Sequence, residues 1–325
     1  MSLDNDLTKK YKIVHIKDLL GQEYIKQFIQ NSLYKNILYP LYIFSGMRGT
    51  GKTSSARLFA VSRLCKKYTD FLSHVHTALP CYECDSCKAY TEGSHPDIIE
   101  IDAASHTGVD NIRIVMENAM LLPVFCQKKF YIIDEAHMLS KAAFNACLKI
   151  MEEPPEHVCF ILATTDPIKI IDTIRSRAIQ LYFKPIEQSI LFVYIQMICQ
   201  REGIGIDDEA ITLLIELSEG SVRDILNMIN TFCITHKHIS YELVQKEHGI
   251  ISRSLLYSLL DAIMDGSKEH IAMHSDNIKK QGVFCKKFFF EQSLLYLHEI
   301  IKKTEYSKTK AFILARLMYD DESLF

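Results

Sequence analysis

The sequence lacks several features that define other classes of protein. No run approaches the roughly 18 consecutive apolar residues of a membrane helix, and the amino-terminal segment MSLDNDLTKK has no signal-peptide core. Repeats and low-complexity tracts are also absent. The formal net charge is -3, whereas free-standing nucleic-acid-binding domains usually gain affinity from a large positive excess. We therefore expect a cytoplasmic protein without a membrane contact, in which any DNA contact is local or shared with partner chains.

Short β-rich apolar runs alternate with helical patterns in the first part of the chain. The runs that predict strands are 41–46, 97–102, 129–135, 158–165 and 178–183. Helical patterns lie between the first four runs, as in a parallel sheet covered by helices on both faces. The length of 325 residues allows two or three domains with cores of their own. We predict an α/β domain over residues 1–183.

Helical periodicity replaces the strand-like runs after residue 183. The segments SILFVYIQMICQRE, DEAITLLIELSEG and SVRDILNMINTFC predict a small helical domain over 184–245. Further helical patterns, ending with CKKFFFEQSLLYLHEIIKK, predict a second helical domain over 246–325.

The segment GMRGTGKT, from Gly46 to Thr53, matches the phosphate-loop pattern and stands between a predicted strand and a predicted helix. Its glycines let backbone N–H groups point at the β- and γ-phosphates of a nucleotide, at the positive end of the following helix. Lys52 would neutralise the phosphates and the Thr53 hydroxyl would ligate magnesium. The sequence therefore predicts a nucleoside-triphosphate site.

The segment FYIIDEAH supplies the second element that such a site needs. An apolar strand ends in Asp134 and Glu135, where we expect a magnesium-associated carboxylate and a carboxylate that polarises the attacking water. The letters DEAH also occur in a helicase family. A helicase of that kind needs a second nucleotide-cleft domain, and no strand–helix alternation after residue 183 could build one.

Three later segments narrow the class of nucleotide-binding protein. LATTDP places Thr164 and Thr165 at the end of a strand, where a hydroxyl could sense the γ-phosphate. TIRSRA contains Arg175 and Arg177, and GSVRD contains Arg223 at the start of a helix in the second domain. This order of a sensing strand, an arginine before the last strand and an arginine on a helical lid is that of AAA+ ATPases.

The chain resembles the gamma/tau subunits of the bacterial DNA polymerase III clamp loader over about residues 15–245. The segments that carry the resemblance are FSGMRGTGKTSSARLFA, PCYECDSC, DIIEIDAASHTGVDNIR, FYIIDEAHMLSKAAFNACLKIMEEPPEHVCFILATTDP and TIRSRA. The resemblance implies an AAA+ ATPase domain with a parallel sheet, a small helical lid and a collar-like helical oligomerisation domain. It also implies a subunit that hydrolyses ATP within the DNA polymerase III holoenzyme.

The resemblance further implies partners and residue roles. The partners would be delta-like and delta-prime-like subunits, further copies of the chain, the sliding clamp and primed DNA reached through the assembly. ATP would be bound by the phosphate loop and its neighbours: Gly46, Met47, Arg48, Gly49, Thr50, Gly51, Lys52, Thr53, Ser54, Gln22 and Arg223. The catalytic residues would be Lys52, Asp134, Glu135, Thr165 and Arg177, and Mg²⁺ would be held by Thr53 and Asp134.

Two of the implied arginines have distinct roles. Arg177 would act on ATP bound by a neighbouring subunit, whereas Arg223 would contact ATP in its own chain. Ala178 stands where the family has a cysteine after this arginine. The Arg-Pro pair that usually precedes the family's adenine-contact box is also missing, which leaves open the adenine contacts near Tyr11, Gly21 and Gln22.

The cysteines predict a metal site within an insertion at about 65–87. Two residues separate Cys81 from Cys84 and Cys84 from Cys87, and Cys65 lies at the end of the predicted helix after the phosphate loop. Four thiolates suit a closed structural zinc site. The competing possibility is an iron–sulfur cluster, but the fourth ligand and proline of a ferredoxin motif do not follow Cys87.

Other ligand sets and another function remain open at this point. His74 or His76 could replace Cys65 as a zinc ligand, and the remaining six cysteines are expected to be packing residues. The function could be that of a working ATPase motor subunit, or that of a nucleotide-binding scaffold with poor turnover. The motor is favoured by the joint presence of Lys52, Thr53, Asp134, Glu135 and Arg177.

Overall fold

The computed structural model describes residues 6–73, 78–105, 109–280, 289 and 292–296. The chain folds into two compact units. The first unit comprises residues 1–198 and 215–234, and the second comprises residues 199–214 and 235–325. None of the described helices is both long and apolar enough to cross a membrane.

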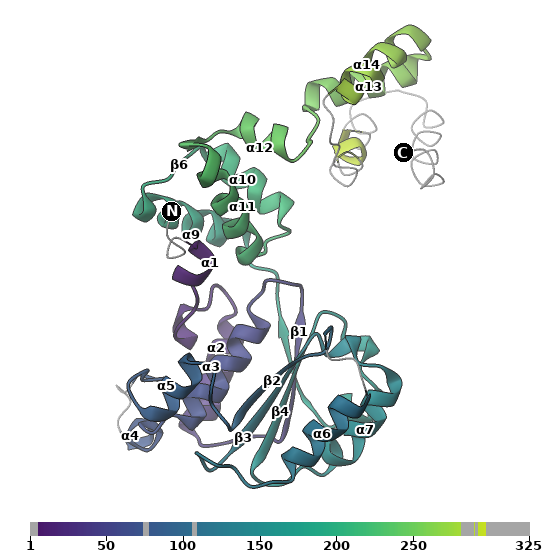
Figure 1. The fold of residues 1–325 in the computed structure, drawn as a ribbon. Helices are drawn as coiled ribbons and strands as arrows, with labels where there is room; N and C mark the ends of the chain where they lie inside the picture. The colour runs from purple at the N-terminus through teal and green to yellow at the C-terminus, as the bar shows by residue number, and fades with distance from the viewer. Residues whose placement is uncertain (1–5, 74–77, 106–108, 281–288, 290–291, 297–325) are drawn as a thin grey trace. The chain divides into compact units, whose positions relative to one another are not determined.

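A parallel five-stranded sheet forms the centre of the first unit (Figure 1). Its strands are β1 (Leu41–Gly46), β2 (Ile98–Asp102), β3 (Lys129–Asp134), β4 (Val158–Thr164) and β5 (Ile179–Phe183). They lie in the order β2-β3-β4-β1-β5, and all four neighbouring pairs are parallel. The predicted parallel α/β sheet is therefore confirmed, with each strand within two residues of its predicted bounds.

Helices cover both faces of this sheet. On one face lie α2 (Glu23–Tyr34), α3 (Lys52–Leu64) and α5 (Asp85–Thr91), and on the other lie α6 (Val109–Ala119), α7 (Lys141–Glu152) and α8 (Asp172–Arg175). Successive side chains of a strand point to opposite faces. In β1, Tyr42 and Phe44 therefore pack in the core beneath α2 and α3, whereas Leu41 and Ile43 pack in the opposite core.

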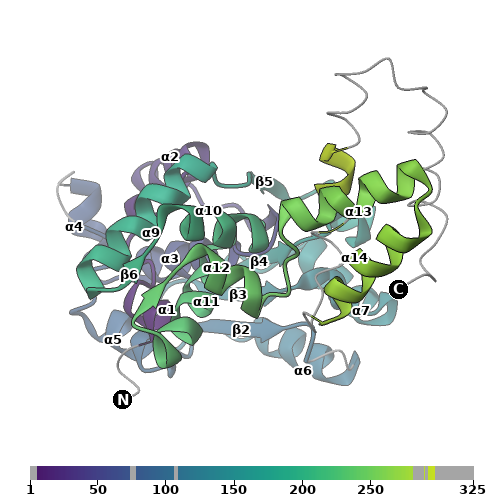
Figure 2. The ribbon, with the colours of Figure 1, turned by 90° about the horizontal axis from the view of Figure 1, so that it is seen from above.

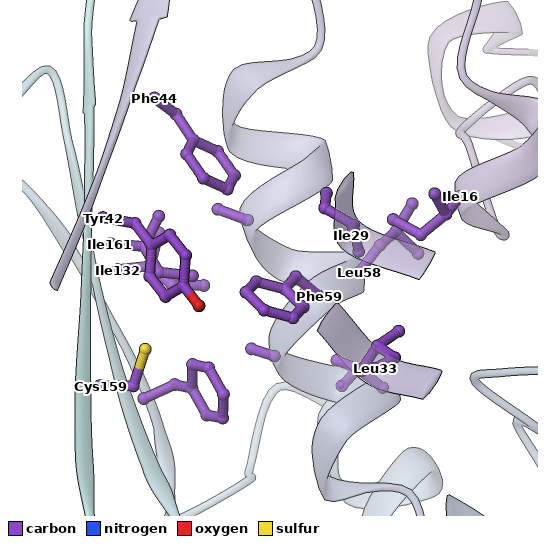
Figure 3. Packing of buried hydrophobic residues seen from close by; sticks show 14 of the residues in the cluster. Ile16, Ile29, Leu33, Tyr42, Phe44, Leu58, Phe59, Ile132, Cys159 and Ile161 are labelled. Carbon is purple, nitrogen blue, oxygen red and sulfur yellow. The ribbon is translucent and has the colours of Figure 1, made fainter. Parts of the chain in front are cut away.

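Figure 3 shows the first of these cores from close by. Phe59 of α3 lies between the sheet residues Tyr42 and Ile161 on one side and the α2 residues Ile29 and Leu33 on the other. The rings of Tyr42 and Phe59 meet edge to face with centroids 5.4 Å apart. Such burial of large aromatic and aliphatic side chains on both faces is what fixes the position of α3 on the sheet.

Short elements complete the first unit. They are α1 (Leu7–Lys10), η2 (Ile16–Asp18), α4 (Tyr68–Ser73), η3 (Ala136–Met138) and η4 (Pro167–Lys169). Several helices begin at side-chain caps, and Ser140 at the start of α7 accepts a hydrogen bond from the Ala143 N–H at 3.1 Å.

The chain after residue 187 is mainly helical, as predicted. Its helices are α9 (Gln188–Glu202), α10 (Asp208–Leu217), α11 (Val222–Thr235), α12 (Tyr241–Glu247), α13 (Arg253–Asp265) and α14 (Lys268–Lys280). One expectation is wrong, because two parallel strands occur here, β6 (Gly205–Ile206) and β7 (His238–Ile239). A strand of two residues is too short to produce the alternation by which strands are recognised.

Within the second unit, α13 and α14 run side by side in both Figure 1 and Figure 2. Leu256, Leu259 and Leu260 of α13 are buried in a cluster with Phe289. The next predicted helical run, 285–303, lies mostly outside the described residues.

Candidate active site and metal centre

The loop between β1 and α3 contains glycines at positions where a side chain would be strained. Gly49 and Gly51 have φ values of 77° and 95°, which side chains disfavour. A Cβ at Gly49 would lie 2.1 Å from the Ser221 Oγ, and one at Gly51 would lie 2.6 Å from the Leu19 Cδ1. The loop ends where α3 begins at Lys52, so the unpaired N–H groups of the first helical turn lie at the carboxyl end of β1.

Lys52 is buried, and its ammonium group lies inside this loop. The Nζ donates hydrogen bonds to the carbonyl oxygens of Gly46 at 2.9 Å and Met47 at 2.8 Å. Burial lowers the pKa of Lys52, opposed by the negative charges of Glu135 and Asp134. Met47 and Arg48 are exposed beside it, whereas Thr50 is buried. The loop therefore concentrates positive charge where phosphates would lie.

The structure brings Thr53 into contact with Asp134, and both residues were predicted to hold magnesium. The Thr53 Oγ1 lies 2.9 Å from each carboxylate oxygen of Asp134, although the two residues are 81 positions apart. A hydroxyl and a carboxylate are the hard oxygen ligands that Mg²⁺ prefers. Their convergence at the carboxyl ends of parallel strands fits a magnesium site.

Glu135 occupies an unusual backbone conformation directly after β3. Its φ of 46° and ψ of 43° are left-handed, and its N–H donates to the Asp134 Oδ1 at 3.0 Å. The Oε2 atom is buried and has no hydrogen-bond partner among the described residues. It lies 3.4 Å from the Nδ1 of His137, a residue that no motif singled out.

The two threonines at the end of β4 differ in their surroundings. Thr164 is fully buried, and its Oγ1 lies 3.1 Å from the His137 Nδ1 and accepts the Asp166 N–H at 3.0 Å. Thr165 is exposed at the same strand end. Its role as a γ-phosphate sensor stays a prediction.

The three arginines lie on exposed elements. Arg175 pairs with Asp172 on the same turn. Arg177 is half exposed, lies 3.2 Å from the Glu152 Oε1 and donates to the Thr173 carbonyl at 3.1 Å. Their roles, and that of Arg223, which is exposed on α11, stay predictions.

Gln22 fastens the amino-terminal segment to the end of β5. Its Nε2 donates to the Lys184 carbonyl at 2.6 Å, and its Oε1 accepts the Lys184 N–H at 3.1 Å. Gln22 thus ties the start of α2 to the residue after β5, and its contact with the nucleotide stays a prediction. Ser54 is half buried in the first turn of α3.

The four predicted cysteine ligands converge. The sulfur atoms of Cys65, Cys81, Cys84 and Cys87 all lie within 4.8 Å of one another. Tetrahedral zinc with Zn–S bonds of about 2.3 Å would place its sulfurs about 3.8 Å apart, so the donors fit this ion. The contact with Cys87 lowers the pKa of the Cys65 thiol to about 5 and raises that of Cys87. His74 and His76 lie outside the described residues.

The backbone beyond this cluster is held by a carboxylate that sequence patterns did not indicate. Asp97 is fully buried, and its oxygens accept the N–H groups of Val124 at 2.8 Å, Phe125 at 2.6 Å and Cys126 at 2.7 Å. Asp97 therefore fixes the loop that leads into β3. Its partners lie 27 to 29 positions later, which is why no local motif reveals the interaction.

Comparisons with sequence families agree with this architecture. Residues 21–187 match the family described as "DNA polymerase III, delta subunit". Residues 193–246 match the family described as "RFC1-like, AAA+ ATPase lid domain".

Several curated proteins are similar over most of the chain. The tau/gamma subunit of DNA polymerase III from Haemophilus influenzae is 39% identical over 264 residues, which are 81% of this chain and 37% of that protein. The tau subunit from Bacillus subtilis is 34% identical over 93% of this chain and 55% of its own length. The gamma subunit from Buchnera aphidicola subsp. Schizaphis graminum is 33% identical over 93% of this chain and 81% of its own length. The chain therefore spans about half the length, or less, of the first two of these relatives and most of the length of the third.

The solved structures extend the comparison to the fold. Thermotoga maritima RuvB carrying T158V matches with a TM-score of 0.51 and 16% identity, over 78% of this chain and 79% of that one. A structure titled as the RuvB Holliday junction branch migration motor of the same organism gives the same values. At this identity the likeness shows the AAA+ fold alone.

Proposed function

Because this chain belongs to the family of DNA polymerase III gamma and tau/gamma subunits, we propose that it is the ATP-binding and ATP-hydrolysing motor subunit of a clamp loader. In this role it drives the loading of a ring-shaped sliding clamp onto primed DNA. The observation that carries the proposal is the convergence of Lys52, Thr53 and Asp134 at the carboxyl ends of parallel strands.

Each residue of this cluster has a chemical task. The N–H groups of the loop and the Lys52 ammonium bind the phosphates. Thr53 and Asp134 would hold Mg²⁺, which when bound would supply positive charge next to the phosphates. Glu135 lies next to Asp134 and polarises the attacking water, so that catalysis rests on positioning and on charge stabilisation.

The arginines extend the site beyond one chain. Arg177 lies on the segment after α8 and is half exposed, which suits a residue that reaches the γ-phosphate of a neighbouring subunit. Arg223 acts on ATP of its own chain. The assembly contains further copies of this chain together with delta-like and delta-prime-like subunits, and it acts in the cytoplasm.

One zinc ion per chain is held by the four cysteines, and its role is structural. A site with four thiolate ligands leaves no position for water, so zinc here stabilises the inserted segment and takes no part in hydrolysis. Elemental analysis of the purified chain should find zinc and no iron. Retention of zinc after Cys65→Ser would assign the fourth ligand to His74 or His76.

The phosphate site is tested by Lys52→Ala, with the exposed Lys35→Ala as the matched control. Loss of a buried, preorganised charge should lower ATP turnover by about a hundredfold or more while the circular dichroism spectrum stays native. Lys35→Ala should leave turnover unchanged. Normal turnover in Lys52→Ala would overturn the ATPase assignment. A chain that binds ATP, and whose low turnover does not rise with clamp and primed DNA, would be a scaffold.

The neighbouring-subunit role is tested by Arg177→Ala in the reconstituted assembly, with the exposed Arg201→Ala as control. We expect ATP affinity of the isolated chain to be unchanged and clamp-stimulated turnover to fall about a thousandfold. Mixed assemblies of Arg177→Ala and Lys52→Ala chains should recover some activity, because each supplies what the other lacks. Full stimulation in Arg177→Ala assemblies would exclude the role.

A further inference from the structure

We propose that His137 is a positioning residue that holds the Glu135 carboxylate in its working orientation, with Thr164 fixing the imidazole ring from the other side. The inference rests on the proposed ATPase function, because it assigns a task to a neighbour of the proposed catalytic carboxylate.

The backbone of Glu135 is fixed, but its side chain needs a separate restraint. Left-handed φ is uncommon outside glycine and persists where the surrounding structure imposes it. Here the Glu135 N–H donates to the Asp134 Oδ1 at 3.0 Å, and its carbonyl accepts the Met138 N–H at 2.8 Å. These two bonds fix the backbone position from which the Glu135 side chain extends. They leave its three side-chain torsions free.

His137 supplies the missing restraint. The Glu135 Oε2 is buried without a hydrogen-bond partner, and a carboxylate oxygen taken out of water needs a donor. The His137 Nδ1 lies 3.4 Å away, just beyond ideal hydrogen-bond length. A small rotation of either side chain closes this gap. His137 is only 13% exposed, so its ring is held within the protein.

Thr164 holds the same ring nitrogen. Its Oγ1 lies 3.1 Å from the Nδ1 and already accepts the Asp166 N–H. A protonated Nδ1 can donate its hydrogen to the oxygens of both Thr164 and Glu135. An unprotonated Nδ1 would point its lone pair at the carboxylate instead, so the geometry assigns the proton to Nδ1.

The contacts among these three side chains depend on the order of the strands in the sheet. Glu135 and His137 follow β3, Thr164 ends β4, and β3 pairs with β4 in parallel. The three side chains therefore meet at one edge of the sheet.

The test uses the full chain reconstituted with its partner subunits, clamp and primed DNA. His137→Ala should lower the kcat for ATP about tenfold or more and leave the ATP Kd within about twofold, because it removes the orientation of a catalytic group and no contact with ATP. His137→Asn should keep most of the kcat, because its amide nitrogen occupies the place of Nδ1. His157→Asn is the control, since the Nε2 of that ring is hydrogen-bonded to the carbonyls of Ala119 and Leu121 and, among the described residues, the ring makes no hydrogen bond with Glu135.

A second pair of variants tests the proposal independently, so that it can still be judged if His137→Ala does not fold. Thr164→Val keeps the shape but loses the hydroxyl, and should lower the kcat about threefold to tenfold, whereas Thr164→Ser should behave like the wild type. Nitrogen-15 NMR of labelled histidines, assigned with His137→Asn, should show a protonated Nδ1.

The outcomes separate this inference from the proposed function. A kcat for His137→Ala within about twofold of wild type, or equal loss in His137→Asn and His137→Ala, would overturn the positioning role. An unprotonated Nδ1 would overturn it as well. Wild-type chains that hydrolyse no more ATP than Lys52→Ala chains would instead refute the ATPase function.

Discussion

Removing the charge of Asp97 should loosen the loop before β3 and leave the remaining fold intact. Asp97 is fully buried and accepts three N–H bonds, one at Oδ1 and two at Oδ2. In Asp97→Asn the amide oxygen can replace only one carboxylate oxygen. It will turn toward Phe125 and Cys126 and keep two bonds, while its NH₂ group faces the N–H of Val124, where two donors meet.

The expected loss of stability in Asp97→Asn follows from the hydrogen bonds that the substitution removes. A hydrogen bond to a charged group contributes about 1.5–3 kcal/mol. Val124 is 78% exposed as a residue, so after the substitution its N–H can turn toward water and offset part of the loss. We expect Asp97→Asn to lower the free energy of unfolding by about 2 kcal/mol. Asp97→Ala, which removes all three bonds, should cost about 4 kcal/mol or more.

Urea denaturation and amide hydrogen exchange measure the two parts of this prediction. The amides of Val124, Phe125 and Cys126 should exchange faster in Asp97→Asn, while those of β3 keep their protection. Asp70→Asn removes the same charge from an exposed position on α4 and should change stability by less than about 0.5 kcal/mol. Equal stability of the two variants, with unchanged exchange at the three amides, would refute the role of Asp97.

Three further predictions follow from local geometry. Cys84→Ser should release zinc and lower the melting temperature by several degrees without changing ATP affinity, as measured by metal analysis and thermal denaturation; unchanged zinc content would contradict the site. Gly49→Ala, whose Cβ would lie 2.1 Å from the Ser221 Oγ, should weaken binding of a fluorescent ATP analogue at least about tenfold, and native affinity would show that the loop tolerates a side chain. Ser140→Ala removes the cap of α7 and should cost about 1 kcal/mol in urea denaturation, with an unchanged midpoint arguing against the cap.

The central fold was predictable because its signals are local. Each strand of the large sheet is a run of five to seven residues, which is long enough for a β-rich apolar pattern to stand out, and helical periodicity separates most of the runs. The strands β6 and β7 have two residues each. No periodicity exists at that length, so they were missed.

The residues of the candidate site likewise differ in whether a local sequence pattern identifies them. Lys52, Thr53, Asp134 and Glu135 belong to contiguous motifs, so the sequence alone identifies them. The contact of His137 with Thr164 depends on which strand lies beside β3, and strand order is a property of the whole sheet. The sequence also left open which threonine at the end of β4 is buried.

Side chains that stabilise the fold were harder to predict than those proposed to act on the nucleotide. The three bonds of Asp97 join residues almost thirty positions apart, and an isolated aspartate gives no local signal. The cysteine cluster is an intermediate case. Three cysteines form a recognisable motif, whereas Cys65 could be included only because it ends the helix after the phosphate loop.

The position of β1 in the sheet has a consequence for synthesis of the chain. Leu41 pairs with Phe160 of β4, and Tyr42 pairs with Ile179 of β5. At about 5–20 residues per second, a ribosome needs on the order of 6–24 s to add the 120 or so residues that separate β1 from its first partner. Throughout this time the apolar segment LYIFSG has no strand to pair with. Of the strands in this sheet, the one that leads into the phosphate loop therefore waits longest for its partners, and this delay is what exposes a nascent strand to aggregation.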